Sequence, residues 1–412
     1  MAIRTEFISG LNRIFRSLMI PAFTAFYVSI LTAQVSVSEE EWVIPTYLVA
    51  PSNKNPIFYN NETHQGAARH VYPYAMNDTY LNRRVDKAYK ALILENEFIK
   101  LCVTPEIGGK LYYATDKTNG YNFIYKNDVV RPSNIGMLGA WVSGGIEWCV
   151  LHHHRASTFL PMDYEMVENA DGSKTIYIGE TEPRHRIRWT IGITSFPGKS
   201  YFRAELKIHN PTPFNHSFLY WANVAAHTNK DLQVIFPPSV QFATYHAKND
   251  FTHWPLSTEV YQGQDFTKGV DISWWINSVN ANSYFAHDLK EDFMGAYDHG
   301  RQSGTVHIGD HNIVKGAKLW EWGSGPRGQA TEARLTENAG PYVEIMVGAY
   351  SDNQPDYSWI KPYEVKISEQ YWYPVKDIQG FKNANLNGAV NLESRQKNSV
   401  FLGYYSTSKV NK

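Results

Sequence analysis

The stretch Arg186–Asn210, RIRWTIGITSFPGKSYFRAELKIHN, decides the fold of this chain. Apolar residues take every second position of its first half, and residues 197–200 (PGKS) supply a turn. The same alternation then resumes, and the apolar positions of the two halves are Ile187, Trp189, Ile191, Ile193, Phe202, Ala204, Leu206 and Ile208. Because successive side chains of a β-strand point to opposite faces, this pattern predicts a long antiparallel hairpin with one buried and one solvated face.

Strand patterns continue on both sides of this hairpin. Residues 164–168 and 175–179 flank the turn NADGS, and residues 91–94 and 98–104 flank the turn ENE. Further strand patterns occupy residues 110–115, 218–224, 305–308 and 342–349. No stretch places apolar residues at helical spacing over three turns, and the sequence has no repeat of fixed period. We therefore predict an all-β fold, one large antiparallel two-sheet sandwich, rather than a βαβ fold or a propeller.

The composition excludes several classes of protein. The 412 residues are 43% hydrophobic, 14% aromatic and 19% charged, and 39 Lys and Arg against 40 Asp and Glu leave a net charge of −1. A nucleic-acid-binding protein usually carries a basic excess that neutralises phosphates, so we predict no nucleic-acid partner. Two cysteines cannot form a disulfide framework in a chain of this length.

The N-terminal residues have the pattern of a signal peptide. Arg4, Arg13 and Arg16 precede an apolar run at residues 18–31, and a small-residue site for cleavage follows at Ala33. A membrane anchor is the alternative, but the run is short against the ~20 residues of a spanning helix. We expect residues 1–33 to be removed on export to the periplasm or the extracellular space, and we predict no transmembrane segment beyond them.

The C-terminal residues change character after residues 383–385 (NAN). The chain becomes polar over residues 386–412, and residues 400–405 have the pattern of a single strand. One strand cannot bury its own face. We therefore expect a main sandwich domain over residues 34–385, followed by a segment that either adds a strand to it or begins a second, truncated β domain.

The first candidate site is the segment SGGIEWCVLHHHR, residues 143–155. We predict Glu147 as a catalytic residue of a polar ligand site, with Trp148, His153, His154 and Arg155 as substrate-binding residues. Histidines solvated at a strand end are the alternative. A metal centre needs converging ligands, and no second cluster of His or Cys has metal-binding spacing, so we predict no metal and no other cofactor.

The second candidate segment runs from residue 340 to residue 359. Glu344 alternates with Val343, Ile345 and Val347, so its carboxylate points away from those apolar side chains. We predict Glu344 as a second catalytic residue. Carboxylates and amides bind hydroxyl groups, and aromatic rings stack on sugar rings. The following loop supplies the predicted binding residues Gln354, Asp356, Tyr357 and Trp359, unless it is an ordinary polar turn.

The third candidate is Glu369, in the segment EQYWYP. Three aromatic neighbours could remove water from its carboxylate and raise its pKa, as an acid–base catalyst needs. We predict Glu369 as a catalytic residue, with a surface carboxylate at a strand end as the alternative.

At these motifs the chain resembles a known family, the secreted bacterial "domain of unknown function 5107" family. The shared motifs are TPEIGGKL (104–111), GGIE (144–147), HHR (153–155), PMDY (161–164), FPP (236–238), GVDIS (269–273), GAYD (295–298), GPYVE (340–344) and DNQPD (352–356). The resemblance implies a galactose mutarotase-like β-supersandwich, a group that includes aldose epimerases, polysaccharide lyases and domains of glycoside hydrolases. Members of the family often continue into a second β domain and tetratricopeptide repeats.

The chain departs from the patterns of these relatives in places. Cys149, Val150 and Leu151 stand where the 5107 family tends to have Asn, Trp and Pro. Glu369 resembles the C-terminal base of aldose epimerases, but Leu219 stands where the resemblance places their acidic histidine.

Three functions are compatible with the sequence. The first is an extracytoplasmic, glycoside hydrolase-like enzyme with paired carboxylates that acts on a carbohydrate. The second is a carbohydrate-binding module without activity, and the third is an aldose epimerase. The sequence leaves the sugar, the linkage and the oligomeric state open.

Overall fold

The computed structural model describes residues 34–56, 71–152, 154–396 and 399–409. The predicted signal peptide and His153, one of the predicted binding residues, lie outside these described residues. Residues 34–412 form one compact unit by themselves. Across the described ranges, no helix is both long enough and apolar enough to cross a membrane.

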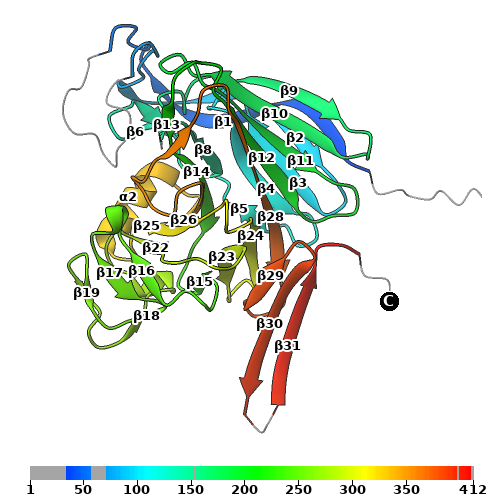
Figure 1. Ribbon diagram of the computed structural model, residues 1–412, viewed down its shortest axis with the longest axis vertical. Helices are drawn as coiled ribbons and strands as arrows, with labels where there is room; N and C mark the ends of the chain where they lie inside the picture. Colours follow the sequence, from blue (N-terminus) through cyan, green and yellow to red (C-terminus); the bar gives the residue numbers. More distant parts are fainter. Residues whose placement is uncertain (1–33, 57–70, 153, 397–398, 410–412) are drawn as a thin grey trace, which may run out of the picture. The chain divides into compact units, whose positions relative to one another are not determined.

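The larger of two main sheets contains twelve of the described strands (Figure 1). They are β1 (Ser36–Val49), β2 (Tyr80–Glu95), β3 (Ile99–Thr104), β4 (Lys110–Asp116), β5 (Asn122–Ile124), β8 (Ile146–Cys149), β14 (Tyr220–His227), β16 (Phe242–Thr244), β17 (Phe251–His253), β22 (Asn282–Ala286), β25 (Gly316–Glu321) and β26 (Tyr342–Ala349). Their order across the sheet is β1-β2-β3-β4-β8-β14-β26-β25-β22-β16-β17, and β5 pairs with β4. Strands far apart in the sequence, such as β8, β14 and β26, are therefore direct neighbours.

The second main sheet contains eight of the described strands. They are β9 (Asp163–Glu168), β10 (Lys174–Thr181), β11 (Arg188–Ser195), β12 (Phe202–His209), β15 (Leu232–Ile235), β23 (Phe293–Asp298), β24 (Ser303–Ile308) and β28 (Val365–Lys376), in the order β15-β23-β24-β28-β12-β11-β10-β9. The predicted hairpin is β11 and β12, which pair antiparallel with Ile191 opposite Leu206. The predicted all-β class and two-sheet architecture are confirmed.

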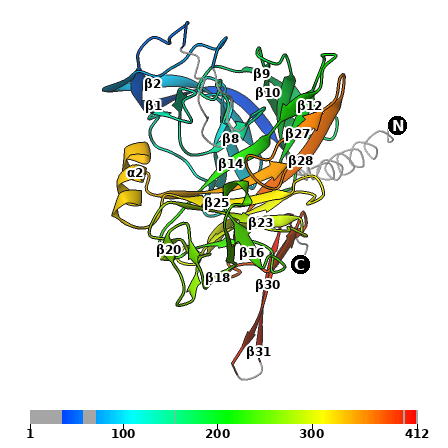
Figure 2. The ribbon, with the colours of Figure 1, turned by 60° about the vertical axis from the view of Figure 1, so that its left-hand side comes forward.

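Short ribbons and turns lie in the loops that join the strands of the main sheets. The described two-stranded ribbons pair β6 (Ser133–Asn134) with β7 (Ala140–Trp141), β13 (His216–Phe218) with β27 (Ser358–Ile360), β18 (Leu256–Ser257) with β21 (Val270–Asp271), and β19 (Val260–Tyr261) with β20 (Gln264–Asp265). Two 3₁₀ turns, η2 (His246–Lys248) and η3 (Trp275–Asn277), lie in the loops. Figure 2 shows these connections from a second side.

One α-helix, α2 (Pro326–Thr336), was not expected from the sequence. Its buried residues are Gly328, Glu332, Leu335 and Thr336, of which only Leu335 is a large apolar residue. Helical periodicity is detected through an apolar stripe, and this helix does not have one. The prediction that no helix interrupts the strands was therefore wrong at this position.

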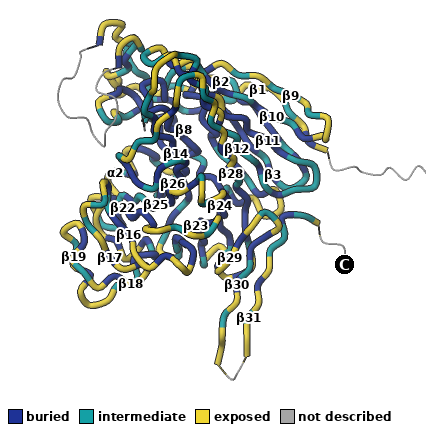
Figure 3. Tube along the Cα trace, viewed as in Figure 1, coloured by how far each residue is buried: buried dark blue, intermediate teal, exposed yellow. Residues whose placement is uncertain are grey.

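The main core fills the space between the two sheets (Figure 3). Alternate residues of the hairpin, including Trp189 and Ile191, point into it. Trp372 stacks on Phe202 at 5.5 Å between ring centroids and meets Trp148 edge to face at 6.4 Å. Complete burial of one such side chain contributes about 1.5–3 kcal/mol. Much of the aromatic content therefore stabilises the sandwich.

The C-terminal residues form a third sheet. It contains β29 (Asn383–Asn385), β30 (Gly388–Arg395) and β31 (Ser399–Ser406). The predicted strand at residues 400–405 is not single, because it pairs antiparallel with β30 along its whole length. The rings of Tyr373 and Tyr405 stack 6.3 Å apart, so this sheet packs on the outer face of the second main sheet.

Candidate functional site

Polar side chains line one face of the larger sheet across five adjacent strands. On β8, Ile146 and Trp148 point into the main core. Glu147 and Cys149 alternate with them along the strand, so their side chains point to the opposite face. Asn223 of β14 lies directly opposite Glu147 in the strand pair. The same face carries Lys110 of β4, Glu344 of β26 and Lys318 of β25. The alternation that buries the core therefore also collects two carboxylates and two ammonium groups.

Glu147 is buried but fully hydrogen-bonded. Its Oε2 atom accepts the indole N–H of Trp141 at 2.9 Å and lies 3.0 Å from Nδ1 of His154. Its Oε1 atom accepts the hydroxyl of Thr158 at 2.7 Å. Burial alone would raise the pKa of Glu147, but His154, Lys110 and these hydrogen bonds outweigh it, and the pKa lies well below its ordinary value. Glu147 is therefore held as a carboxylate.

Glu344 lies in the opposite electrostatic environment. It is 7% exposed, and burial raises its pKa, against the lowering effect of Lys318. The Glu147 carboxylate also raises the pKa of Glu344, so the two acids interact. Glu147 lies opposite Asn223 of β14 and Glu344 lies opposite Ala225, two residues further along. Two strand spacings of about 4.8 Å and this offset of about 6.8 Å place the backbones of the two residues roughly 12 Å apart. The structure thus brings together two of the three predicted catalytic carboxylates.

Lys110 and Lys318 complete a row of charged groups on this sheet face, and neither was predicted from the sequence. We call Glu147, Glu344, Lys110 and Lys318 the charged row. Burial lowers the pKa of Lys318 to about 8, and Glu344 partly offsets this effect. Its Nζ atom donates to Oε1 of Gln354 at 3.1 Å and lies 3.2 Å from Nε2 of His246. Burial also lowers the pKa of Lys110 to about 8, and its Nζ atom donates to the carbonyl of Val142 at 2.7 Å. Lys318, inside the mostly apolar strand β25, was the available signal for one of them, whereas Lys110 is the first residue of β4.

His154 links Glu147 to the surface. Its side chain is 11% exposed, and Nδ1 lies between Oε2 of Glu147 and Sγ of Cys149, the latter at 3.9 Å. Its ring meets Trp141 edge to face at 6.5 Å. Of the residues predicted to bind substrate, His154 and Gln354 therefore contact the charged row.

Trp148 does not lie in the candidate site. It is completely buried in the core between the sheets, and its indole N–H donates to the carbonyl of Gly109 at 3.1 Å. It is the neighbour of Glu147 on the strand, so its side chain points to the other face. The prediction that Trp148 stacks on a sugar was wrong.

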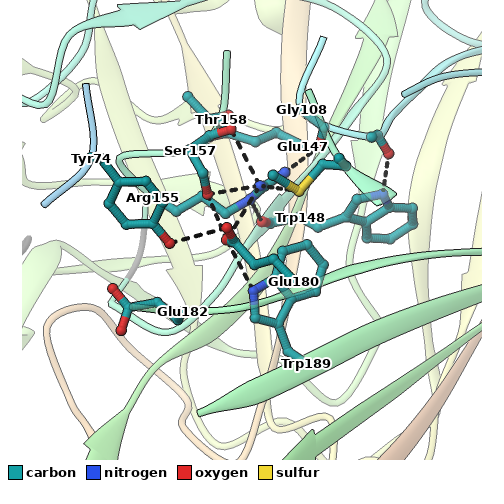
Figure 4. Close-up of polar contacts among 12 residues, drawn as sticks. Tyr74, Gly108, Glu147, Trp148, Arg155, Ser157, Thr158, Glu180, Glu182 and Trp189 are labelled. Carbon is teal, nitrogen blue, oxygen red and sulfur yellow. Dashed lines mark hydrogen bonds and ion pairs between the residues drawn. The ribbon is translucent and has the colours of Figure 1, made fainter. Parts of the chain in front are cut away.

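Arg155 is a structural residue that spans the core side of the site (Figure 4). It is 3% exposed, and its guanidinium donates to the carbonyls of Trp148 and Gly108 and to the hydroxyl of Ser157. Glu180 of the second sheet lies 3.9 Å away. Because Arg155 is almost completely buried and its guanidinium donates to backbone carbonyls, the structure contradicts the prediction that it binds substrate.

Glu369 is separated from the other two carboxylates by the whole sandwich. Gln370 and Trp372 point into the core, so Glu369 points outward, with 42% of its side chain exposed. It pairs with Arg203 at 3.0 Å and accepts the hydroxyl of Tyr371 at 3.0 Å. It borders a cavity of about 860 Å³ beside β29. The aromatic neighbours do not desolvate Glu369, so the expected environment was wrong, and its acid–base role stays a prediction.

The remaining predicted binding residues lie near the loop after β26. Asp356 is exposed and pairs with Lys248 at 3.1 Å, and Tyr357 contacts the ring of His152 at 5.7 Å. Both border a polar cavity of about 460 Å³. Trp359 on β27 is 65% exposed, as a sugar-stacking residue would be.

The fold and the site define a class: a two-sheet β-supersandwich with a buried row of acids and lysines on one face of its larger sheet. Comparison with known families gives the assignment. The profile of "Domain of unknown function (DUF5107)" matches residues 67–375, and the chain belongs to this family.

Solved structures share the fold. A TPR-domain containing protein from Parabacteroides distasonis is 24% identical, with a TM-score of 0.72 over 90% of this chain, and this chain spans 60% of its length. A candidate aldose 1-epimerase from Klebsiella pneumoniae is 12% identical, with a TM-score of 0.53 over 82% of this chain and 92% of its own. A galactose mutarotase-like protein from Clostridium acetobutylicum is 9% identical, with a TM-score of 0.48 over 70% of this chain and 96% of its own. The predicted galactose mutarotase-like fold is confirmed.

Proposed function

We propose that this protein is an extracytoplasmic carbohydrate-active enzyme that cleaves a glycan by acid–base catalysis with Glu147 and Glu344. One observation carries the proposal: two buried carboxyl groups lie on one sheet face, with the pKa of one lowered and that of the other raised. Pairs of acids whose environments move their pKa values apart are typical of catalytic acid and base assignments. Carboxylates that flank a glycosidic bond are the usual machinery of glycoside hydrolysis.

The environments assign the roles. Glu344, with its raised pKa, holds a proton and acts as the general acid toward the leaving oxygen. Glu147 stays ionised and holds Nδ1–H of His154, so that the imidazole accepts a proton from the attacking water through Nε2.

The test is product release from a panel of neutral oligosaccharides and polysaccharides, followed by mass spectrometry. The proposal expects a new reducing end with the wild-type protein and its loss in Glu147→Gln. The exposed Glu369→Gln serves as the matched control and keeps full activity. Binding of the same glycans without turnover would instead identify a non-catalytic binding module.

Aldose epimerisation is the second candidate, and one observation favours it. The position that resembles the epimerase histidine is Leu219, which is buried, but a β-bridge joins Leu219 to His152. His152 thus lies beside the place where an epimerase has its acid. Polarimetry of freshly dissolved sugars measures anomerisation directly. A rate above the uncatalysed rate that His154→Gln removes, with no glycan cleavage, would favour this candidate.

A further inference from the structure

A carboxylate, a thiol and an imidazole, three groups that bind metal ions, lie close together at β8 in the candidate site. Cys149 follows Glu147 on the same face of β8, and the loop after β8 returns His154 to both of them. Sγ of Cys149 lies 3.9 Å from Nδ1 of His154, and Nδ1 lies 3.0 Å from Oε2 of Glu147. All three atoms lie within 4.8 Å of one another. We propose that Glu147, Cys149 and His154 bind a zinc-like divalent transition-metal ion.

The spacing fits tetrahedral coordination. Zinc bonds of about 2.3 Å to sulfur and 2.0–2.2 Å to nitrogen or oxygen place tetrahedral ligands roughly 3.4–3.6 Å apart. The separations of 3.0 and 3.9 Å bracket this range, and the third, between Sγ of Cys149 and the Glu147 carboxylate, is at most 4.8 Å, so side-chain adjustments of about 1 Å or less would complete the site. Thiolate, imidazole and carboxylate together are a ligand set that zinc accepts and that magnesium and calcium do not prefer.

The surroundings hold the ligands in place. Thr158 and Trp141 each donate a hydrogen bond to the Glu147 carboxylate, and such outer contacts orient metal ligands in known sites. The thiol of Cys149 is completely buried beside Trp221, which shields it from solvent. Another group with ligand atoms at this spacing within the described ranges, Asp292, Asp310 and His311, is largely exposed and has no sulfur ligand.

The charges and protons balance. Binding releases the thiol proton of Cys149 to solvent, and the proton on Nδ1 of His154 moves to Nε2, so the imidazole stays neutral. The Glu147 carboxylate and the Cys149 thiolate together carry two negative charges, which match the two positive charges of the divalent ion. The metal bond replaces the contact between His154 and Glu147, so the ion is an inhibitor of the proposed acid–base chemistry and not its cofactor.

The experiment uses cobalt(II), which reports thiolate coordination by a near-ultraviolet charge-transfer band. Titration of the full chain is expected to reach one equivalent with this band, and zinc is expected to displace the cobalt. Cys149→Ser should abolish the band or weaken binding at least 100-fold. Cys102→Ser is the matched control, because Cys102 is the other buried free cysteine and lies in a separate core cluster, so it should leave the band unchanged.

Circular dichroism and the thermal midpoint show that each variant is folded, and His154→Gln gives a second test at a partly exposed ligand. Absence of a thiolate band in folded wild-type protein, or its persistence in Cys149→Ser, overturns the proposal. The optical signal needs no sugar, so it is independent of the proposed function. A protein that binds added cobalt but cleaves no glycan in its metal-free form would refute only the catalytic proposal.

Discussion

Nδ1 of His154 lies 3.0 Å from Oε2 of Glu147, although seven residues separate them in the sequence. The contact exists because β8 ends at Cys149 and the following loop turns back over the polar face of the same strand. It joins a buried anion to a side chain that still reaches the surface. A carboxylate that orients an imidazole in this way fixes which ring nitrogen carries the proton.

Thr158→Val tests how the Glu147 carboxylate is held. The substitution removes the hydroxyl that donates to Oε1, so the pKa of Glu147 should rise and stability should fall by about 1–2 kcal/mol. The acid limb of a pH–activity profile should move to higher pH. Thr158→Ser restores the hydroxyl and should restore the wild-type profile. An unchanged profile in the valine variant would show that this hydrogen bond does not set the pKa.

Glu332 on α2 should make stability fall as the pH rises. Burial raises its pKa to about 8 in the folded protein, while the ordinary value is near 4.5. A raised folded pKa gives a stabilisation that is complete below the unfolded pKa and lost as the pH rises through the folded one. Relative to wild type, Glu332→Gln should therefore gain roughly 2 kcal/mol between pH 5 and pH 8. Urea denaturation of both proteins at the two pH values measures the change. If the stability difference between Glu332→Gln and the wild-type protein is the same at both pH values, the prediction is refuted.

Arg155 should contribute to stability and not to binding. Arg155→Met leaves the carbonyls of Gly108 and Trp148 and the Glu180 carboxylate without the guanidinium, at an expected cost of about 3 kcal/mol. Arg155→Lys keeps the positive charge but loses the planar set of guanidinium donors, so its stability should lie between that of the wild-type protein and that of Arg155→Met. Thermal unfolding ranks the three proteins. If both variants are as stable as wild type but lose glycan binding, the assignment of Arg155 to the core is wrong.

The local part of the fold follows from the sequence. Period-two alternation and turn residues predicted the β11–β12 and β9–β10 hairpins, because such pairs are neighbours in the sequence. The neighbours of β14 cannot be read in this way, since β8 and β26 lie about 70 and 120 residues away along the chain. Helix α2 was missed because its buried side contains a glycine, a glutamate and a threonine.

The candidate site was predictable only in part. Alternation correctly separated Glu344 from its apolar neighbours, yet the same rule applied to Glu147 would have placed Trp148 in the core. The aromatics next to Glu369 misled the prediction, because Tyr371 shares its face and Trp372 does not. Lys110 and Lys318 join the site through pairing between distant strands, which no single segment reveals.

The predicted export remains a proposal and has a direct test. Expression with the native N-terminus in a bacterial host should place the mature protein outside the cytoplasm, with Gln34 as its first residue. N-terminal sequencing and fractionation measure this. Replacement of Ala33 by a bulky residue should leave the precursor uncleaved, and a cytoplasmic, full-length wild-type protein would contradict the prediction.

The most direct test of the acid–base account is the comparison of Glu344→Gln with Glu369→Gln on a cleaved glycan. Loss of a general acid typically costs about 10²–10⁴-fold in rate, whereas an exposed carboxylate outside the site should cost nothing. The account therefore predicts that kcat falls at least 100-fold in Glu344→Gln and stays at the wild-type value in Glu369→Gln. Equal kcat for Glu344→Gln and the wild-type protein, with both folded, would contradict it.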